Sequence, residues 1–185
     1  ETAVHWHGIR LENRFDGVPG VTQDPVLPGG SFRYQIYFPD AGIYWYHPHH
    51  REDIQQELGL YGNLVVESLD RDYYGPADRD EVLMLDDILL DEDGLVDFGD
   101  GSANYMLMGR FGNVPLVNGE PRYTLAVKDG EVVRFHLTNA SNTRTFNISF
   151  IANEWYESHV RGVAEPLKEA ANGRLPIKVV ATDVS

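Results

Sequence analysis

The chain has no cysteine, no long apolar run and few basic residues. Without cysteine, neither a disulfide nor a thiolate metal ligand can contribute to its fold or its chemistry. No stretch approaches the roughly 18 consecutive apolar residues that a membrane-spanning helix needs. The 15 Lys and Arg residues stand against 29 acidic ones, for a formal net charge of −14. Because this charge repels phosphate groups, nucleic acid and anionic membranes are poor partners.

Four of the seven histidines, in contrast, form two His-X-His pairs, His5-Trp6-His7 and His47-Pro48-His49. Side chains at positions i and i+2 of a β-strand point to the same face. Each pair therefore presents two imidazoles together, and two neighbouring strands would gather four. Neutral imidazole is a good ligand for copper, zinc, iron and nickel. We interpret the pairs as a metal site; ordinary strand histidines are the alternative.

Alternation of apolar and polar residues dominates the chain and predicts an all-β protein. Turn signals recur about every ten residues, which is typical of antiparallel β-sandwiches. Residues 28–38 and 128–138 both read as a turn followed by an alternating strand, so we expect two copies of one sandwich type. The expected strands are 31–38, 43–47, 60–67, 81–87, 111–119, 123–127, 132–139 and 145–151.

A polar segment with a Gly-Pro step, residues 69–80, predicts a linker between two domains, 1–68 and 81–185. The chain begins without Met inside an apparent strand and stops just past another, so we expect a piece of a longer protein. The first domain would then be incomplete at its N-terminus, and the second domain would also be incomplete. A long excursion at about 152–176 holds the one expected helix, 165–171, and is interpreted as a loop insertion rather than a lid.

Several motifs together resemble the first cupredoxin domain of multicopper oxidases, the laccase-like enzymes. They are VHWHGIR at 4–10, DGVPGVTQ at 16–23, PGGSFRY at 28–34, DAGIYWYHPH at 40–49 and LYGNLVV at 60–66. The resemblance is specific over residues 1–67, because it joins both histidine pairs to turn motifs at the right separations. Residues 113–119 and 130–141 resemble the second cupredoxin domain more loosely. The implied fold is two Greek-key cupredoxin-like β-sandwich domains.

The resemblance implies copper chemistry at a trinuclear cluster that reduces dioxygen to water. By position, His5 corresponds to a ligand of the type 2 copper. The ligands of the type 3 copper pair would be His7, His47 and His49.

Asp16 matches the carboxylate that the family keeps beside the cluster. There it would anchor the water and histidine network and help to relay protons. From the residues alone, Asp16 could equally be a turn residue before Gly17. His50 points opposite His49 on an extended chain, so we expect it near the surface rather than among the ligands.

The type 1 copper of this family needs a cysteine thiolate, which the chain lacks. The resemblance therefore implies that the type 1 site and the remaining cluster ligands lie in an absent C-terminal cupredoxin domain or in another chain. Dioxygen and a small reducing substrate would be the reactants, and this chain alone would be inactive. A periplasmic or extracellular location is also implied.

Two other functions fit the same histidines. A copper-binding or metal-handling sandwich without turnover would use them for storage or resistance. A cupin-like or zinc hydrolase site is a weaker alternative, because it needs a further carboxylate or histidine and none stands at an obvious spacing.

Overall fold

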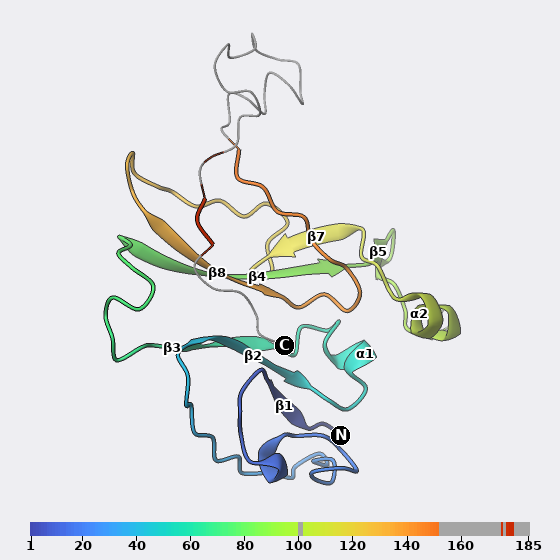
Figure 1. The fold of residues 1–185 in the computed structure, drawn as a ribbon. Helices are drawn as coiled ribbons and strands as arrows, with labels where there is room; N and C mark the ends of the chain where they lie inside the picture. Colours follow the sequence, from blue (N-terminus) through green and yellow to red (C-terminus); the bar gives the residue numbers. More distant parts are fainter. Residues whose placement is uncertain (100–101, 152–174, 176, 180–185) are drawn as a thin grey trace. The chain divides into compact units, whose positions relative to one another are not determined.

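The computed structural model describes residues 1–99, 102–151, 175 and 177–179 (Figure 1). Within these residues the regular structure consists of eight strands and three short helices. The strands are β1 (Val4–His7), β2 (Gly42–Pro48), β3 (Gly62–Val66), β4 (Arg79–Ile88), β5 (Leu90–Asp91), β6 (Gly94–Leu95), β7 (Val114–Val117) and β8 (Val133–Asn139). The helices are the 3-10 helix η1 (Asn13–Phe15), α1 (Glu52–Gln55) and α2 (Ser102–Met108). The predicted all-β class is confirmed.

Two compact units divide the chain, residues 1–145 and residues 146–184. The named strands all belong to the first unit. In the second unit, the backbone N–H of Leu175 donates to the carbonyl of Phe150 at 2.8 Å. Apart from Leu175, the predicted excursion at 152–176 lies outside the described residues, as does the helix expected at 165–171.

One antiparallel sheet has the order β1-β2-β3 (Figure 1). The turn at 39–41 feeds directly into β2, whose sequence GIYWYHP is rich in the aromatic residues that favour strands. In the ladder His5 lies opposite His47, and His7 lies opposite Trp45. This register places both predicted histidine pairs at the same end of one sheet.

The second sheet has the order β7-β4-β8, with β4 as the central strand. β4 pairs antiparallel with β7 and parallel with β8. Parallel neighbours cannot be joined by a tight hairpin, so the chain crosses over between β4 and β8 through β7 and the residues that follow it. As the central strand, β4 buries Leu83 and Met84 together with the two carboxylates Asp86 and Asp87.

Three expected strands are not part of a ladder in the structure. Residues 31–38, 123–127 and 145–150 carry no strand assignment, although their alternating sequences predicted one. Alternation describes a residue pattern that suits a strand, whereas a strand also needs a neighbouring backbone to accept and donate its hydrogen bonds. These segments have no such ladder partner among the described residues, so the prediction is wrong at these places.

Buried polar contacts connect the sheet of β1–β3 with the sheet of β4, β7 and β8. Gln56, just after α1, donates its side-chain N–H to the carbonyl of Ala140 at 2.7 Å. Thr138 on β8 donates its hydroxyl to Oδ1 of Asn63 on β3 at 2.7 Å. β4 begins at Arg79, inside the segment expected to be a linker. The domain boundaries at 69–80 stay a prediction.

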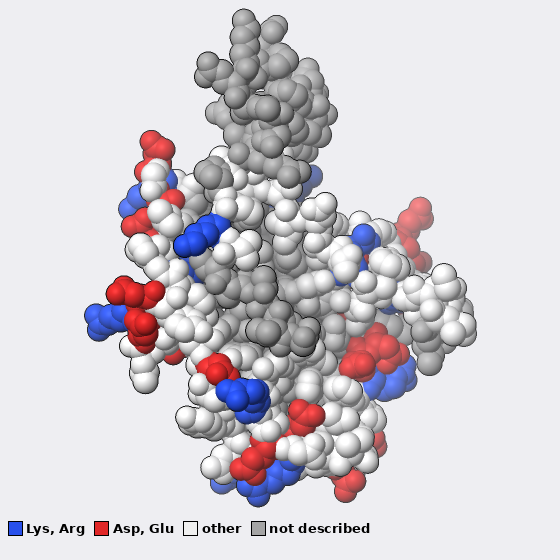
Figure 2. Space-filling view, viewed as in Figure 1, with Lys and Arg blue, Asp and Glu red and all other residues white. Residues whose placement is uncertain are grey.

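The described helices are all too short, or not apolar enough, to cross a membrane. Charged side chains of both signs are interspersed on the face shown in Figure 2, with Lys and Arg as separate groups rather than one basic patch.

Candidate metal centre

Four imidazoles lie together at the end of the sheet where β1 meets β2. His5 and His7 share a face of β1 because they are two residues apart, and the ladder places His47 on that face opposite His5. The ring centroid of His5 lies 5.6 Å from that of His7, 5.4 Å from that of His47 and 5.3 Å from that of His49. The structure therefore gathers the rings that the sequence predicted.

Three of these residues, His5, His7 and His47, offer ligand nitrogens within 4.8 Å of one another. Nδ1 of His7 faces Nε2 of His47 across 3.4 Å. Bonds between imidazole nitrogen and a metal ion are about 2 Å long. Two nitrogens 3.4 Å apart can therefore both bind one ion without a shift of the backbone. On this test the residues fit a bound copper ion.

Backbone carbonyls determine which ring nitrogens point toward the centre. Nδ1 of His5 lies 2.7 Å from the carbonyl of Asp16, and Nδ1 of His47 lies 3.0 Å from the carbonyl of Pro48. A carbonyl oxygen only accepts, so each Nδ1 carries the proton and donates it. The Nε2 atoms of both rings then keep their lone pairs for a metal. Such hydrogen bonds commonly fix the tautomer of metal-binding histidines.

Asp16 lies beside His5 because the chain passes close to β1 at the next residue. At Gly17, with φ of +76°, a Cβ atom would lie 1.8 Å from the carbonyl oxygen of Val4. Only glycine permits that approach, which leaves Oδ1 of Asp16 3.5 Å from Nδ1 of His5. The carboxylate is about one-third exposed at 34%. Asp16 thus contacts a candidate ligand and also reaches solvent.

His47 is the most buried ring of the cluster, with 6% of its surface exposed. Burial lowers the pKa of His47 from its ordinary value of 6.5 to about 4, and the neighbouring rings of His5, His7 and His49 add to this. The hydrogen bond to the carbonyl of Pro48 acts in the opposite direction but is outweighed. His47 is therefore neutral at physiological pH, the form that binds metal.

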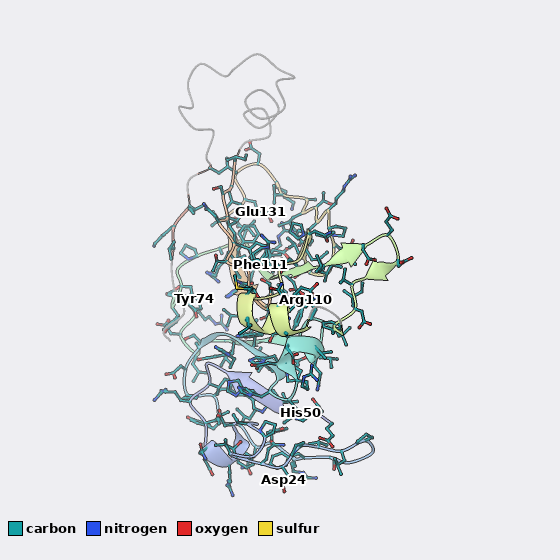
Figure 3. All side chains as sticks on the ribbon, turned by 90° about the vertical axis from the view of Figure 1, so that its right-hand side faces the viewer. Asp24, His50, Tyr74, Arg110, Phe111 and Glu131 are labelled. Atoms are coloured by element: carbon teal, nitrogen blue, oxygen red, sulfur yellow. The ribbon has the colours of Figure 1, made fainter. Side chains whose placement is uncertain are left out.

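His49 lies beside His5, but its nitrogens are not among the closely spaced ones of the cluster. Its ring centroid lies 6.0 Å from that of His47, and its Nε2 lies 4.0 Å from a carboxylate oxygen of Glu52. It is not a member of the three-residue group with close nitrogens. His50, labelled in Figure 3, pairs with Glu1 at 3.6 Å rather than joining the cluster.

Aromatic side chains pack on both faces of β1 and β2. Trp45 stacks on His47 with ring centroids 4.4 Å apart and lies 5.1 Å from His7. Trp6 points to the opposite face, where it contacts Tyr34 and Tyr46. His7 and His47 therefore lie against the indole ring of Trp45.

Two polar residues that support β1 were not identified from the sequence pattern. The hydroxyl of Tyr34 accepts the backbone N–H of Val4 at 3.1 Å and donates to the side chain of Gln23 at 2.8 Å. Gln55 bonds to the beginning of β1 from the other side. Such long-range contacts leave no periodic signal in a sequence, so only the tertiary structure shows them.

Comparison with known proteins shows what this chain is similar to. A family profile described as "Multicopper oxidase" matches residues 1–71. Copper resistance protein A of Pseudomonas syringae pv. tomato is 41% identical over 86 residues, which cover 46% of this chain and 14% of that protein. Multicopper oxidase MmcO of Mycobacterium tuberculosis is 28% identical over 190 residues, which cover 87% of this chain and 36% of the relative.

Among solved structures, the multicopper oxidase of Pseudomonas thermotolerans is similar with a TM-score of 0.66 and 38% identity, over 81% of this chain and 35% of that one. The likeness supports the cupredoxin-type β-sandwich architecture expected from the sequence. Residues 1–71 match the multicopper oxidase family, and the chain resembles a solved multicopper oxidase over most of its own length. It spans between 14% and 36% of the length of these three proteins.

Proposed function

We propose that this chain supplies one half of a trinuclear copper site in an oxidase that reduces dioxygen to water. The observation that carries the proposal is the convergence of imidazoles from β1 and β2 on one face, with three nitrogens within 4.8 Å. His5 would bind the type 2 copper. The type 3 pair would be held by His7, His47 and His49.

Copper bound here would supply the electron transfer to dioxygen, and the residues of this chain would hold and orient the imidazoles that bind it. The carbonyls of Asp16 and Pro48 keep the Nδ1 protons of His5 and His47 in place, so that Nε2 of each ring faces the centre. The packing of Trp45 against His47 restricts rotation of that ring. Preorganised ligands lose less entropy when the metal binds.

Asp16 is the candidate for proton delivery. Reduction of dioxygen to water consumes protons, and the Asp16 carboxylate lies 3.5 Å from Nδ1 of His5 while remaining 34% exposed to solvent. A group with contacts on both sides can pass protons from bulk water to the site. Its carbonyl holds His5 at the same time, so one residue would serve both the ligand and the proton supply.

The remaining ligands and the type 1 copper would come from a C-terminal cupredoxin domain or from another chain. Two observations support this. The chain contains no cysteine. Most of the chain aligns with two multicopper oxidases, but the alignment covers only about a third of each of them. A small reducing substrate would supply electrons through that other part. A periplasmic or extracellular location fits the family resemblance and is tested by cell fractionation.

Copper analysis of the complete gene product tests the proposal. We expect several copper ions per molecule, with electron paramagnetic resonance showing a type 2 signal. Changing His47 to Gln should lower the copper content and reduce oxygen consumption by at least about 100-fold. Residues that only hydrogen-bond to a metal ligand cost up to about 100-fold when changed, so the loss of a ligand should cost at least as much. His136→Gln is the matched control, because His136 lies on β8 and pairs with Asp80 at 3.0 Å.

Two outcomes would contradict the oxidase. Equal loss of activity in the His47 and His136 variants would show that the β1–β2 face is not the site. Tight copper binding with no oxygen consumption in the complete gene product, under any reducing substrate tried, would favour a metal-handling protein without turnover.

A further inference from the structure

The side chain of Gln55 links the two segments that carry the histidine pairs. Its Oε1 accepts the hydroxyl proton of Thr2 at 2.8 Å, and its Nε2 donates to the carbonyls of Glu1 at 3.0 Å and His50 at 2.5 Å. Glu1 and Thr2 lead into β1, and His50 directly follows the second pair. One amide group is therefore bonded to both segments at once.

We infer that Gln55 is a positioning residue that fixes the register of β1 on β2 and so keeps His5 and His7 facing His47. The expected effect of Gln55 on copper binding rests on the proposed function, whereas its role in holding the register of β1 does not. In a strand, a slip of one residue turns every side chain to the other face. After such a slip of β1, both of its histidines would point away from His47.

The pattern of hydrogen bonds at Gln55 distinguishes the native register from registers in which β1 is shifted by one residue. Oε1 needs a donor, and the hydroxyl of Thr2 provides one. A slip of one residue would place Ala3 or Glu1 at this point, and neither side chain has a hydroxyl group. The slip would also break the bond from the backbone N–H of His49 to the carbonyl of Ala3, now 3.0 Å long. The Gln55 contacts therefore favour one register.

β1 needs such support because it is only four residues long and pairs with one strand, β2. On its other side it contacts the irregular segment 16–34, through Tyr34 and through a bridge between Thr2 and Val26. Short ladders contribute few hydrogen bonds, so each contact outside the ladder has a large share in holding the strand.

The turn after β2 determines where Gln55 lies. Arg51 has a left-handed backbone, with φ of 47° and ψ of 48°, and its side chain bonds to Asp53 at 2.9 Å. Its carbonyl accepts the N–H groups of Ile54 and Gln55 at 3.0 and 2.8 Å. This tight reversal brings the first turn of α1 beside the beginning of β1. The next residue, Gln56, points elsewhere and bonds to Ala140.

Gln55→Glu and Gln35→Glu form a matched pair for the test, made in the complete gene product, because Gln35 is exposed. Glutamate keeps the length of Gln55 and an oxygen for Thr2, but it removes both N–H donors and places a carboxylate against two carbonyls. Hydrogen–deuterium exchange of the copper-free proteins measures the backbone amides of residues 4–7 and 49. We expect exchange at least about 10-fold faster in Gln55→Glu than in Gln35→Glu, because local opening exposes these amides.

Thr2→Val is the second variant, which removes only the hydroxyl and serves if Gln55→Glu does not fold. It should accelerate exchange at the same amides, because it removes the donor to Oε1 of Gln55. With copper added, Gln55→Glu should bind about 10-fold more weakly and broaden the type 2 resonance, whereas Gln35→Glu should match the parent protein.

The outcomes separate this inference from the proposed function. Equal exchange at residues 4–7 in both glutamate variants would overturn the positioning role, even if copper binds normally. A parent protein that binds no copper at this face would refute the oxidase, while the exchange measurement would still decide whether Gln55 holds β1 in register.

Discussion

The β1–β2 face gathers histidines, of which His47 is buried, whereas the region around β4 buries acids. On the first face, nitrogens of His5, His7 and His47 lie within 4.8 Å of one another. Around β4, each buried carboxylate has a donor from the same chain: Asp87 accepts from Nε of Arg144 at 2.6 Å, and Asp86 accepts from the hydroxyl of Tyr61.

A third buried carboxylate, Glu57, pairs with Arg110. The ionic group comprises these two residues together with Asp86, Asp87, Tyr61 and Arg144. The side chains of Glu57 and Arg110 are 2% and 4% exposed, and Nε of Arg110 donates to Glu57 at 3.1 Å. Arg110, labelled in Figure 3, also donates to the carbonyls of Val96 and Asp97 and lies over the ring of Phe98. The guanidinium therefore has partners on each side, and Asn142 donates to the second oxygen of Glu57 at 2.8 Å.

The comparison teaches how to distinguish a structural polar group from a site for an outside ligand. A buried charge is costly unless a partner compensates it, so Asp87 and Glu57 occur with arginines and Asp86 with the hydroxyl of Tyr61. Neutral imidazoles carry no such penalty, and the pKa of His47 near 4 keeps it neutral. Ligand nitrogens of His5, His7 and His47 within 4.8 Å of one another can therefore bind a cation, whereas the ionic group near β4 is compensated by donors of the same chain.

The largest expected effect comes from breaking the ionic group. Arg110→Met should lower the free energy of unfolding by about 3–5 kcal/mol, because Glu57 would stay buried without its counter-charge. Urea denaturation of the copper-free protein measures this. Arg10→Met is the control: Arg10 bonds Asp40 in bidentate fashion but is 73% exposed, so its loss should change stability by less than about 1 kcal/mol. Similar losses in both variants would contradict the distinction.

A pH dependence of similar size should come from the histidine face. Because folding lowers the pKa of His47 from 6.5 to about 4, the unfolded chain binds an extra proton between these values. The free energy of unfolding of the copper-free protein should therefore fall by about 3 kcal/mol as the pH falls through this window, on account of His47 alone. Above pH 6.5 this contribution is constant.

Denaturation curves of the parent protein and of His47→Gln isolate that contribution from the many carboxylates, which titrate in both. The parent should lose more stability than the variant between pH 6.5 and pH 4. Parallel stability curves over this range would show that His47 is not held neutral by its surroundings.

A smaller effect, seen in turnover rather than in stability, is expected at Asp16. Asp16→Asn keeps the shape and the backbone carbonyl that holds His5, but it removes the proton-accepting carboxylate. Oxygen consumption by the complete protein should fall about 10- to 100-fold while copper content stays unchanged. Asp24→Asn, an exposed change on the same segment and labelled in Figure 3, should leave the rate as it was. Loss of copper in Asp16→Asn would instead indicate a role in holding the metal.

The smallest change is expected at Tyr61. Burial is the main cause that raises the pKa of Asp86, and the bond from Tyr61 counteracts it. Tyr61→Phe removes that donor and should lower the free energy of unfolding at neutral pH by about 1–2 kcal/mol. Tyr44→Phe, whose hydroxyl bonds at the surface to the carbonyl of Asp40, should have a much smaller effect in the same denaturation assay. An equal effect would mean that the Asp86 carboxylate is compensated elsewhere.

The sequence predicted the parts of this protein that depend on local periodicity. The strands β2, β3, β4 and β8 lie where alternation or apolar runs indicated them, and the two histidine pairs share one face as their spacing predicted. The same reasoning was wrong for residues 31–38, which have the alternating pattern but no ladder partner in the described chain. It also did not anticipate α2 or the two short helices η1 and α1, since so few turns give little periodic signal.

What the sequence by itself determined is the set of candidate ligands: two His-X-His pairs, with a glycine after Asp16 and no thiolate. The tertiary structure decided how these meet. The register that places His5 opposite His47, the approach of Gly17 to Val4 and the bonds of Gln55 to Thr2 all join residues far apart in the chain. Such contacts depend on shape and hydrogen-bond geometry in three dimensions, which residue order along one strand does not encode.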